Sequence, residues 1–182
     1  MSALQNLQAA TSLEDVASLL GFSPKGLAFI LYKIPVEQRY TTFAIKKKSG
    51  GEREIKAPIE QLKEVQKRLS ALLYECRAEI AKGRSGPLSH GFRRGLSIVT
   101  NAQPHKRRRY VLNLDLENFF PTFNFGRVWG FFQKDTAFKL HPKVATVIAQ
   151  IACDGDALPQ GSPCSPIISD LIGLLPVWWT PR

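Results

Sequence analysis

The feature that most constrains the fold is a long run of apolar residues at helical spacing between Pro58 and Ala81. These residues recur every three or four positions, at Ile59, Leu62, Val65, Leu69, Leu72, Leu73, Cys76 and Ile80. This period places them on one face of an α-helix, which Gly83 is expected to end. An apolar face of this length needs cover, so other parts of the chain must pack against it.

A β-hairpin is predicted directly before this helix. Phe43 and Ile45 alternate with polar residues, a Ser-Gly-Gly turn follows at 49–51, and Ile55 resumes the alternation. Further elements are predicted as well: helices over residues 11–21, from Pro24 onward, over 124–132 and over 142–152, and a strand over 110–116. The mixture indicates the α+β class, because the helices are too irregularly placed for repeated β–α–β units.

Composition narrows the class of partner. The 182 residues suffice for one domain or two small ones, and 25 Lys plus Arg against 15 Asp plus Glu give a net charge of +10. This balance favours a polyanion, nucleic acid more often than a membrane, although a merely soluble basic protein has the same composition. No apolar run approaches the roughly 20 residues of a membrane span. The N-terminus lacks a signal-peptide pattern, so we expect a cytoplasmic protein with no membrane contact.

Basic residues gather in two segments. Lys46–Lys48 and Arg53 flank the hairpin turn, where they could engage phosphates or simply face solvent. The second segment, residues 89–109, interleaves Phe92 with basic side chains. We expect five of its residues to contact nucleic acid: His90, Arg93, Arg94, Arg107 and Arg108. A run such as Lys106–Arg109 is also typical of a solvated surface.

Two other segments could carry chemistry. Asp115 ends the predicted strand, where a partly open carboxylate could hold a hard cation such as Mg²⁺ or make an ordinary turn hydrogen bond. Residues 157–166 place three prolines and a glycine around Gln160, Ser162 and Ser165. Such a sequence predicts a rigid loop that presents backbone and small polar groups.

Four segments occur in an order that resembles a known family. They read "IKKKSGGEREIKAP", "SHGFRRGLSIVTNA", "VLNLDLENFFPTFNFGRV" and "LPQGSPCSPIISDLI". Together they resemble successive blocks of the bacterial reverse transcriptases, most closely the retron type, from about residue 26 to residue 172. The resemblance implies a right-hand polymerase fold. It would divide into an N-terminal helical segment (1–35), fingers (36–110), a partial palm (111–172) and an atypical tail (173–182).

The resemblance also assigns roles to residues. Asp115 matches the first catalytic aspartate and would bind Mg²⁺ together with the backbone carbonyl of Leu116. Phe120 matches the bulky gate that collides with a ribose 2′-hydroxyl and so selects deoxynucleotides. Glu117 is at most a helper.

Other matched residues lie on the nucleotide side of such a site. Gln160 and Gly161 match the loop that contacts the incoming nucleotide and the template base. Arg53 and one of Lys46–Lys48, taken as Lys47, match the fingers residues that hold the triphosphate. Arg93 falls in a block near the template path.

One departure from the family pattern limits these expectations. The family carries a paired-aspartate motif, Tyr-x-Asp-Asp, after the LPQG block, whereas this sequence has no Asp-Asp and its last acidic residue is Asp170. After Ile172 it reads "GLLPVWWTPR". We interpret this as truncation or a frame shift, with ordinary divergence as the alternative, and expect an incomplete palm, no thumb and a poorly ordered tail.

Two functions from different classes follow. The first is RNA-directed DNA polymerisation by two-metal nucleotidyl transfer, with Mg²⁺, deoxynucleoside triphosphates, a structured non-coding RNA template and a DNA product. The second is a non-catalytic RNA-binding module that has kept the basic fingers. An effector protein or a remaining polymerase segment is a further expected partner, and antiviral defence is implied by the resemblance alone.

Overall fold

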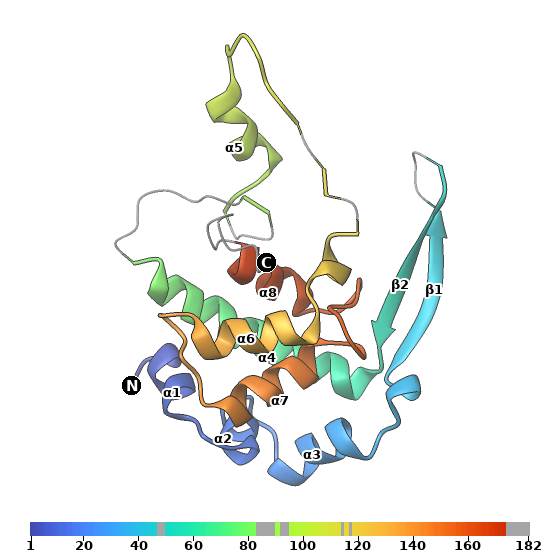
Figure 1. The fold of residues 1–182 in the computed structure, drawn as a ribbon, viewed down its shortest axis with the longest axis vertical. Helices are drawn as coiled ribbons and strands as arrows, with labels where there is room; N and C mark the ends of the chain where they lie inside the picture. The colour runs from blue at the N-terminus through green and yellow to red at the C-terminus, as the bar shows by residue number, and fades with distance from the viewer. Residues whose placement is uncertain (47–49, 83–89, 92–94, 114, 117, 174–182) are drawn as a thin grey trace.

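The computed structural model describes residues 1–46, 50–82, 90–91, 95–113, 115–116 and 118–173. Helices form a body from which a β-hairpin and an arm around helix α5 project (Figure 1). The α-helices are α1 (Ala3–Ala9), α2 (Leu13–Leu19), α3 (Pro24–Tyr32), α4 (Glu60–Ile80), α5 (Ile98–Ala102), α6 (Phe125–Lys134), α7 (Pro142–Ala152) and α8 (Ser165–Gly173). Three short 3₁₀ turns accompany them, η1 (Val36–Gln38), η2 (Gln103–His105) and η3 (Phe120–Thr122).

Helix α4 confirms the longest predicted element and forms the centre of the body. Its apolar face is buried, with Val65, Leu69 and Leu73 fully removed from solvent. Helices α1, α3, α7 and α8 pack against it. The cover that the sequence required is therefore supplied by helices from both ends of the chain.

Four shorter helices were predicted close to where they form, and α2 lies within the range 11–21 that was predicted for it. Ser23 caps α3 by accepting a hydrogen bond from the Gly26 amide, with Pro24 at the first helical position. Asn124 caps α6 in the same way, and α7 has the predicted bounds. These helices follow local rules, which is why their sequences alone located them.

Three other helices were not predicted. Helices α1 and α5 are short, and α8 begins inside the segment that was expected to be only a rigid loop. Pro166 falls in the first turn of α8, where proline is tolerated, and Ile167, Ile168 and Leu171 are buried behind it. The prolines led to the prediction of a loop alone, although the apolar residues that follow Pro166 have helical spacing.

The predicted hairpin is confirmed. Strand β1 (Tyr40–Lys46) pairs antiparallel with β2 (Glu52–Pro58), with Phe43 opposite Ile55. Gly50 and Gly51 adopt positive φ angles at the turn, which their lack of a side chain permits. Much of the hairpin is exposed, so its own strands bury little apolar surface.

The predicted strand over 110–116 is wrong for its described residues, which form neither a strand nor a helix. Val111, Leu112 and Leu116 are exposed rather than buried. A strand persists only when a neighbouring strand satisfies its backbone groups. Within the described residues the named strands form one two-stranded sheet, β1–β2, and it does not include this segment.

The three cysteines are free and buried, and burial raises the pKa of each thiol to about 12. No helix in the described ranges is both long and apolar enough to cross a bilayer. Residues 174–182, on which the prediction of an atypical tail falls, lie outside the described part of the chain.

A buried ion pair links the central helix to the last one. Arg77 Nη2 of α4 lies 2.5 Å from Asp170 Oδ2 of α8, with side-chain exposures of 10% and 5%. We expect Asp170→Asn to lower the free energy of unfolding by about 3–5 kcal/mol, because it removes the negative charge that faces a buried guanidinium. Urea unfolding measures this loss.

Glu64→Gln is the matched control. It neutralises the carboxylate of the exposed Glu64–Arg68 pair on the same helix, which is worth only about 0.3–0.5 kcal/mol. Equal losses in the two variants would contradict a structural role for the Arg77–Asp170 pair.

Candidate functional site

The hairpin contacts the loop between α7 and α8 through its backbone. The Lys56 amide of β2 donates a 2.9 Å hydrogen bond to the Gln160 carbonyl. Gly161 follows with φ +127°, and a side chain built there would place its Cβ 2.7 Å from the Lys56 carbonyl oxygen. This close approach therefore requires glycine at position 161.

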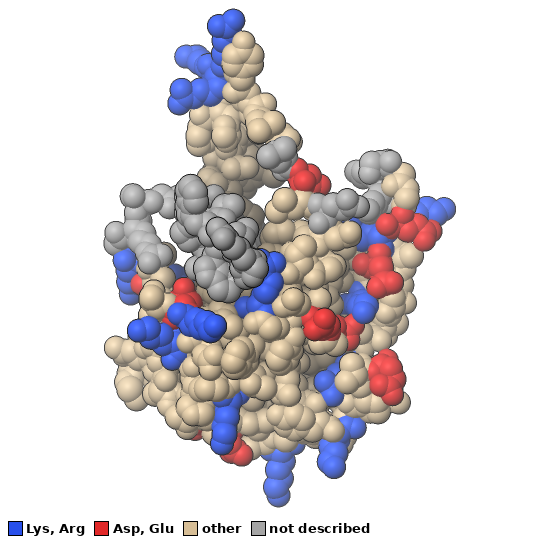
Figure 2. All heavy atoms as spheres, viewed as in Figure 1, with Lys and Arg blue, Asp and Glu red and all other residues tan. Residues whose placement is uncertain are grey.

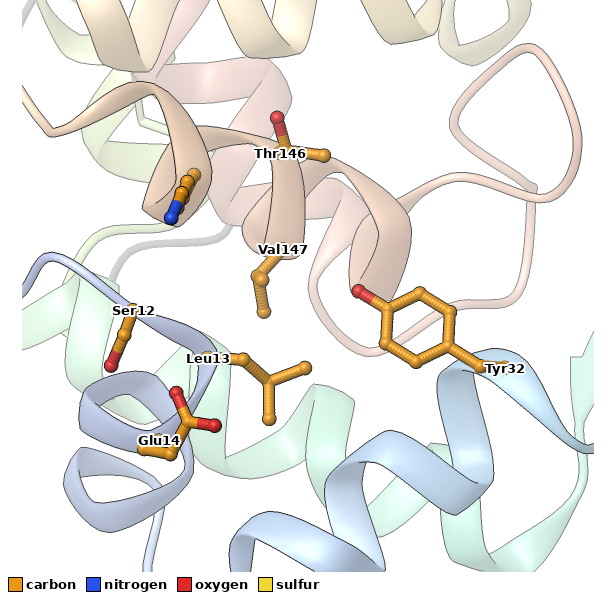
Figure 3. Close-up of a pocket in the computed structure, with 7 residues that line it drawn as sticks. Ser12, Leu13, Glu14, Tyr32, Thr146 and Val147 are labelled. Carbon is orange, nitrogen blue, oxygen red and sulfur yellow. The ribbon is translucent and has the colours of Figure 1, made fainter.

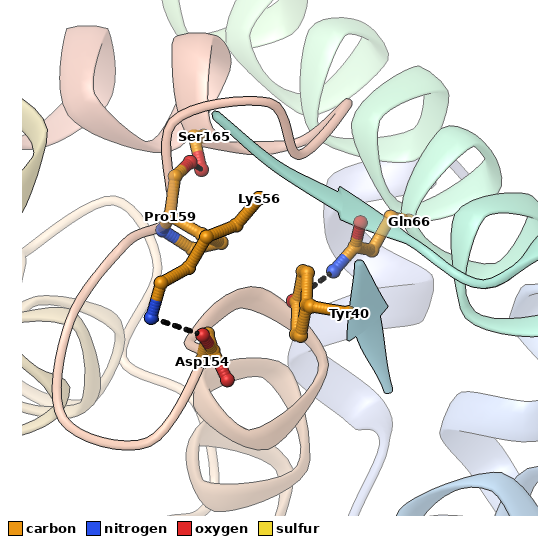
Figure 4. A network of polar contacts seen from close by, with 6 residues as sticks. All are labelled: Tyr40, Lys56, Gln66, Asp154, Pro159 and Ser165. Atoms are coloured by element: carbon orange, nitrogen blue, oxygen red, sulfur yellow. Dashed lines mark hydrogen bonds and ion pairs between the residues drawn. The ribbon is translucent and has the colours of Figure 1, made fainter. Parts of the chain in front are cut away.

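A second contact at the same place is electrostatic. Lys56 Nζ lies 2.7 Å from Asp154 Oδ2, two residues beyond the end of α7 (Figure 4). The hydrogen bond that Lys56 donates to Asp154 raises the pKa of Lys56. Lys56 thus joins the hairpin to the body through both its backbone and its side chain.

The other strand is attached through a buried amide. Gln66 of α4 donates from Nε2 to the Tyr40 hydroxyl at 2.8 Å (Figure 4). It also donates to the Ile151 carbonyl at 2.8 Å. Burial raises the pKa of Tyr40, so its phenol remains neutral and able to hydrogen-bond. Both strands are therefore anchored at their base, close to the C-terminal end of α7.

The segment over 157–166 is ordered by its own hydrogen bonds, as its prolines and small polar residues predicted. Ser165 Oγ donates to the Pro159 carbonyl at 2.9 Å and closes the loop. At its start, the Leu158 amide donates to the Phe123 carbonyl at 3.0 Å. The loop consequently lies between the hairpin and the segment that follows η3.

Asp115 and Leu116 lie on the exposed connection before η3. The Leu116 amide donates to Asp115 Oδ1 at 3.0 Å, which is the local hydrogen bond that the sequence left open as an alternative. In the part of the chain that the structure describes, no three His, Cys, Asp or Glu side chains gather as a metal site would require. The Mg²⁺ site at Asp115 and the Leu116 carbonyl stays a prediction.

Phe120 begins η3 and is half-buried against the core. Its ring makes an edge-to-face contact with Phe119, with centroids 5.5 Å apart. Arg53 is exposed on β2 opposite Ile45, while Lys47 lies outside the described residues. At about 3.3 Å per residue, Arg53 lies roughly 10 Å along the strand from Lys56.

The last part of the second basic segment, residues 106–109, lies at the far end of the arm. Arg107 and Arg108 are exposed, and the Arg109 guanidinium lies 5.3 Å from the centre of the Tyr110 ring. Figure 2 shows Lys and Arg side chains gathered at the tip of this arm, away from the body. These basic side chains are exposed to solvent, so a polyanion could reach them.

His90 Nδ1 lies 2.9 Å from the Thr100 hydroxyl of α5. The contact of His90 with nucleic acid stays a prediction. Arg93 and Arg94, predicted beside it, lie outside the described residues.

Four residues at the hairpin base were missed by sequence reasoning: Tyr40, Lys56, Gln66 and Asp154. One signal was available, because Gln66 interrupts the apolar face of the long helix between Leu62 and Leu69. A polar side chain in a buried stripe must find hydrogen-bond partners. No pattern in the sequence near Gln66 identifies those partners, because Tyr40 and Ile151 are distant along the chain.

An open pocket of about 320 Å³ lies elsewhere, where α2, α3 and α7 meet (Figure 3). Its lining includes Leu13, Tyr32 and Val147. None of the residues assigned to a site from the sequence lines it.

We expect Gly161→Ala to destabilise the chain by more than Gly155→Ala. Both glycines have positive φ, but an added Cβ meets backbone only at position 161. Gly155→Ala should therefore cost about 1–2 kcal/mol from φ strain alone, and Gly161→Ala should cost more because the loop must move from β2. Equal losses in urea unfolding would contradict the close packing.

Comparison with known proteins gives consistent matches. The retron Mx65 reverse transcriptase of Myxococcus xanthus is 45% identical over 119 residues, covering 64% of this chain and 26% of that protein. The retron Ec86 reverse transcriptase of Escherichia coli is 32% identical over 168 residues, covering 91% and 49%. The retron Se72 reverse transcriptase of Salmonella heidelberg is 28% identical, covering 88% and 40%.

No protein-family model matches the chain. The aligned parts span less than half the length of each of these relatives. The matches nevertheless agree with one another and, for two of the three, cover nearly the whole chain. By sequence, the chain belongs to the family of retron reverse transcriptases.

Proposed function

We propose that the chain supplies the fingers and part of the palm of a retron-type RNA-directed DNA polymerase. The reaction is the template-directed transfer of deoxynucleotides onto a 3′-hydroxyl. The observation that carries the proposal is the hydrogen bond between the Lys56 amide and the Gln160 carbonyl, because it joins the basic hairpin to the LPQG loop, residues 158–161. Two segments about a hundred residues apart in sequence thereby meet where a nucleotide would bind.

The nucleotide side of the proposed site has three parts. Arg53 and Lys47 on the hairpin hold the triphosphate, since guanidinium and ammonium groups suit phosphate oxygens. Gln160 and Gly161 contact the nucleotide and the template base. Phe120, held by its packing against the core, excludes a ribose 2′-hydroxyl.

The metal side is incomplete within the described residues. Asp115 offers one exposed carboxylate, and the Leu116 carbonyl can add a backbone oxygen. Two-metal nucleotidyl transfer uses more carboxylates than one. We therefore assign Mg²⁺ to this position only as part of a larger site, whose other ligands come from a further polymerase segment.

The proposed template is a structured RNA that contacts the arm. Arg107 and Arg108 are exposed on the arm, and neither forms an ion pair with an acidic residue in the described part of the chain. Tyr110 is 81% exposed beside Arg109, and such aromatic and guanidinium groups stack on unpaired bases. An effector protein remains a further proposed partner of the complete assembly.

A non-catalytic RNA-binding module is the second candidate. The exposed basic arm favours it, because the arm needs no metal and no second segment to bind RNA. The two candidates agree on RNA binding and differ on nucleotide addition.

RNA binding by the full chain should weaken steeply with salt, because each phosphate contact releases counterions. We expect the double variant Arg107→Ala/Arg108→Ala to flatten the slope of log affinity against log salt by about 1–2. Fluorescence anisotropy with a labelled RNA stem-loop measures it. Lys25→Ala/Lys33→Ala on and next to α3 removes the same charge from exposed positions away from the arm and should leave the slope nearly unchanged. Equal effects would show that only net charge matters.

Primer extension tests whether the metal site of this chain is incomplete. We expect no extension by this chain alone with Mg²⁺ and deoxynucleotides on an RNA template, because Asp115 cannot complete the site by itself. Gel analysis of a labelled primer is the measurement. Extension that is abolished by Asp115→Asn would contradict this expectation and direct attention to Asp154, Asp156 or Glu117 as the missing ligand.

A further inference from the structure

The β1–β2 hairpin cannot set its own orientation. A two-stranded hairpin is marginally stable in water, and here Phe43 and Ile45 remain 45% and 49% exposed. Its angle to the body must therefore be set by contacts at its base. Those contacts come from Tyr40 on β1 and Lys56 on β2.

Lys56 is the residue at which three parts of the chain meet. Its side chain reaches Asp154, just beyond α7, while its amide bonds the Gln160 carbonyl of the loop. Asp154 is itself held, because its amide donates to the Ala157 carbonyl at 3.0 Å. The ion pair thus ties β2 to a fixed point on the same loop that carries Gln160 and Gly161.

The length of the hairpin makes its angle important. Arg53 lies roughly 10 Å beyond Lys56, so a rotation of about 20° at the base moves its Cα by about 3 Å. Hydrogen bonds to phosphate tolerate only a few tenths of an ångström. A small error at Lys56 is therefore enough to separate Arg53 from a phosphate that Gln160 and Gly161 help to place.

We propose that Lys56 and Asp154 are a positioning pair for nucleotide binding. Their ion pair holds the hairpin at the angle at which Arg53, Gln160 and Gly161 face one deoxynucleoside triphosphate. Neither residue touches the nucleotide. The proposal rests on the nucleotide-binding role proposed for this site above.

A purely structural role makes a different prediction. Lys56 is 36% exposed and Asp154 14%, and ion pairs with this degree of exposure add little to global stability. If the pair is purely structural, a variant without it should show faster exchange in the hairpin and loop only when its free energy of unfolding is also lower. If the pair positions the hairpin, its loss should speed exchange in the hairpin and loop while the free energy of unfolding is unchanged.

Hydrogen exchange of the full chain tests the positioning directly. In Asp154→Asn and Lys56→Met we expect the amide of residue 56, which bonds Gln160, to exchange about 5-fold faster or more. Core amides of α4, such as that of Leu69, should keep their native rates, which shows that the variant is folded. Glu60→Gln removes the carboxylate of the exposed Lys63–Glu60 pair and should change neither rate.

Charge reversal gives the rescue. Asp154→Lys alone should loosen residue 56, whereas the exchanged pair Lys56→Asp/Asp154→Lys should recover much of the protection, because an ion pair can form again. Native exchange of residue 56 in Asp154→Asn, or a double variant no better than the single reversal, would overturn the proposal.

Nucleotide affinity tests the consequence. With an RNA primer–template present, Asp154→Asn should weaken binding of a fluorescent dATP analogue about 10-fold and leave RNA affinity unchanged. Arg53→Ala should cost much less in the Asp154→Asn background than alone, because the displaced arginine no longer contacts phosphate. Additive losses would overturn the positioning role.

The two proposals fail differently. If the unaltered chain binds no dATP, the nucleotide-binding function proposed for the site is wrong. The exchange rates of residue 56 then still decide whether the Lys56–Asp154 pair holds the hairpin to the loop.

Discussion

Burial of one face of α4 is the constraint on which the rest of the structure depends. Helices α1, α3, α7 and α8 are held where they are because they cover that face, and α7 and α8 in turn place the ends of the LPQG loop. Gln66, a polar residue within the buried face, extends the same arrangement to the hairpin through the Tyr40 hydroxyl. The candidate site is therefore a consequence of how the central helix is covered.

The site itself is built largely from backbone contacts. Lys56 bonds Gln160, Leu158 bonds Phe123, and Gly161 leaves no room for a side chain beneath the Lys56 carbonyl. Such contacts depend on the path of the chain more than on side-chain identity. They allow the hairpin, the loop and η3 to keep one arrangement while exposed residues such as Arg53 remain available to a ligand.

Prediction from the sequence succeeded where structure is decided locally. The period of the apolar residues located α4, and Ser23 with Pro24 located the start of α3. It failed at residues 110–116, because β-propensity describes a strand only when a partner strand exists. It also missed the Lys56–Asp154 pair, whose members are 98 residues apart and carry no local pattern.

The sequence by itself determined five of the helices (α2, α3, α4, α6 and α7), the hairpin and its turn, the excess of positive charge and the family to which the chain belongs. Each depends on spacing, residue type or order along the chain, which a sequence displays directly. Only the tertiary structure decided that the base of the hairpin meets Gln160 and Asp154, and that Asp115 lies on an exposed connection. These contacts depend on which distant segments cover α4 and satisfy one another's backbone hydrogen bonds. Residues far apart in the sequence carry no local pattern that shows this, so only the folded chain does.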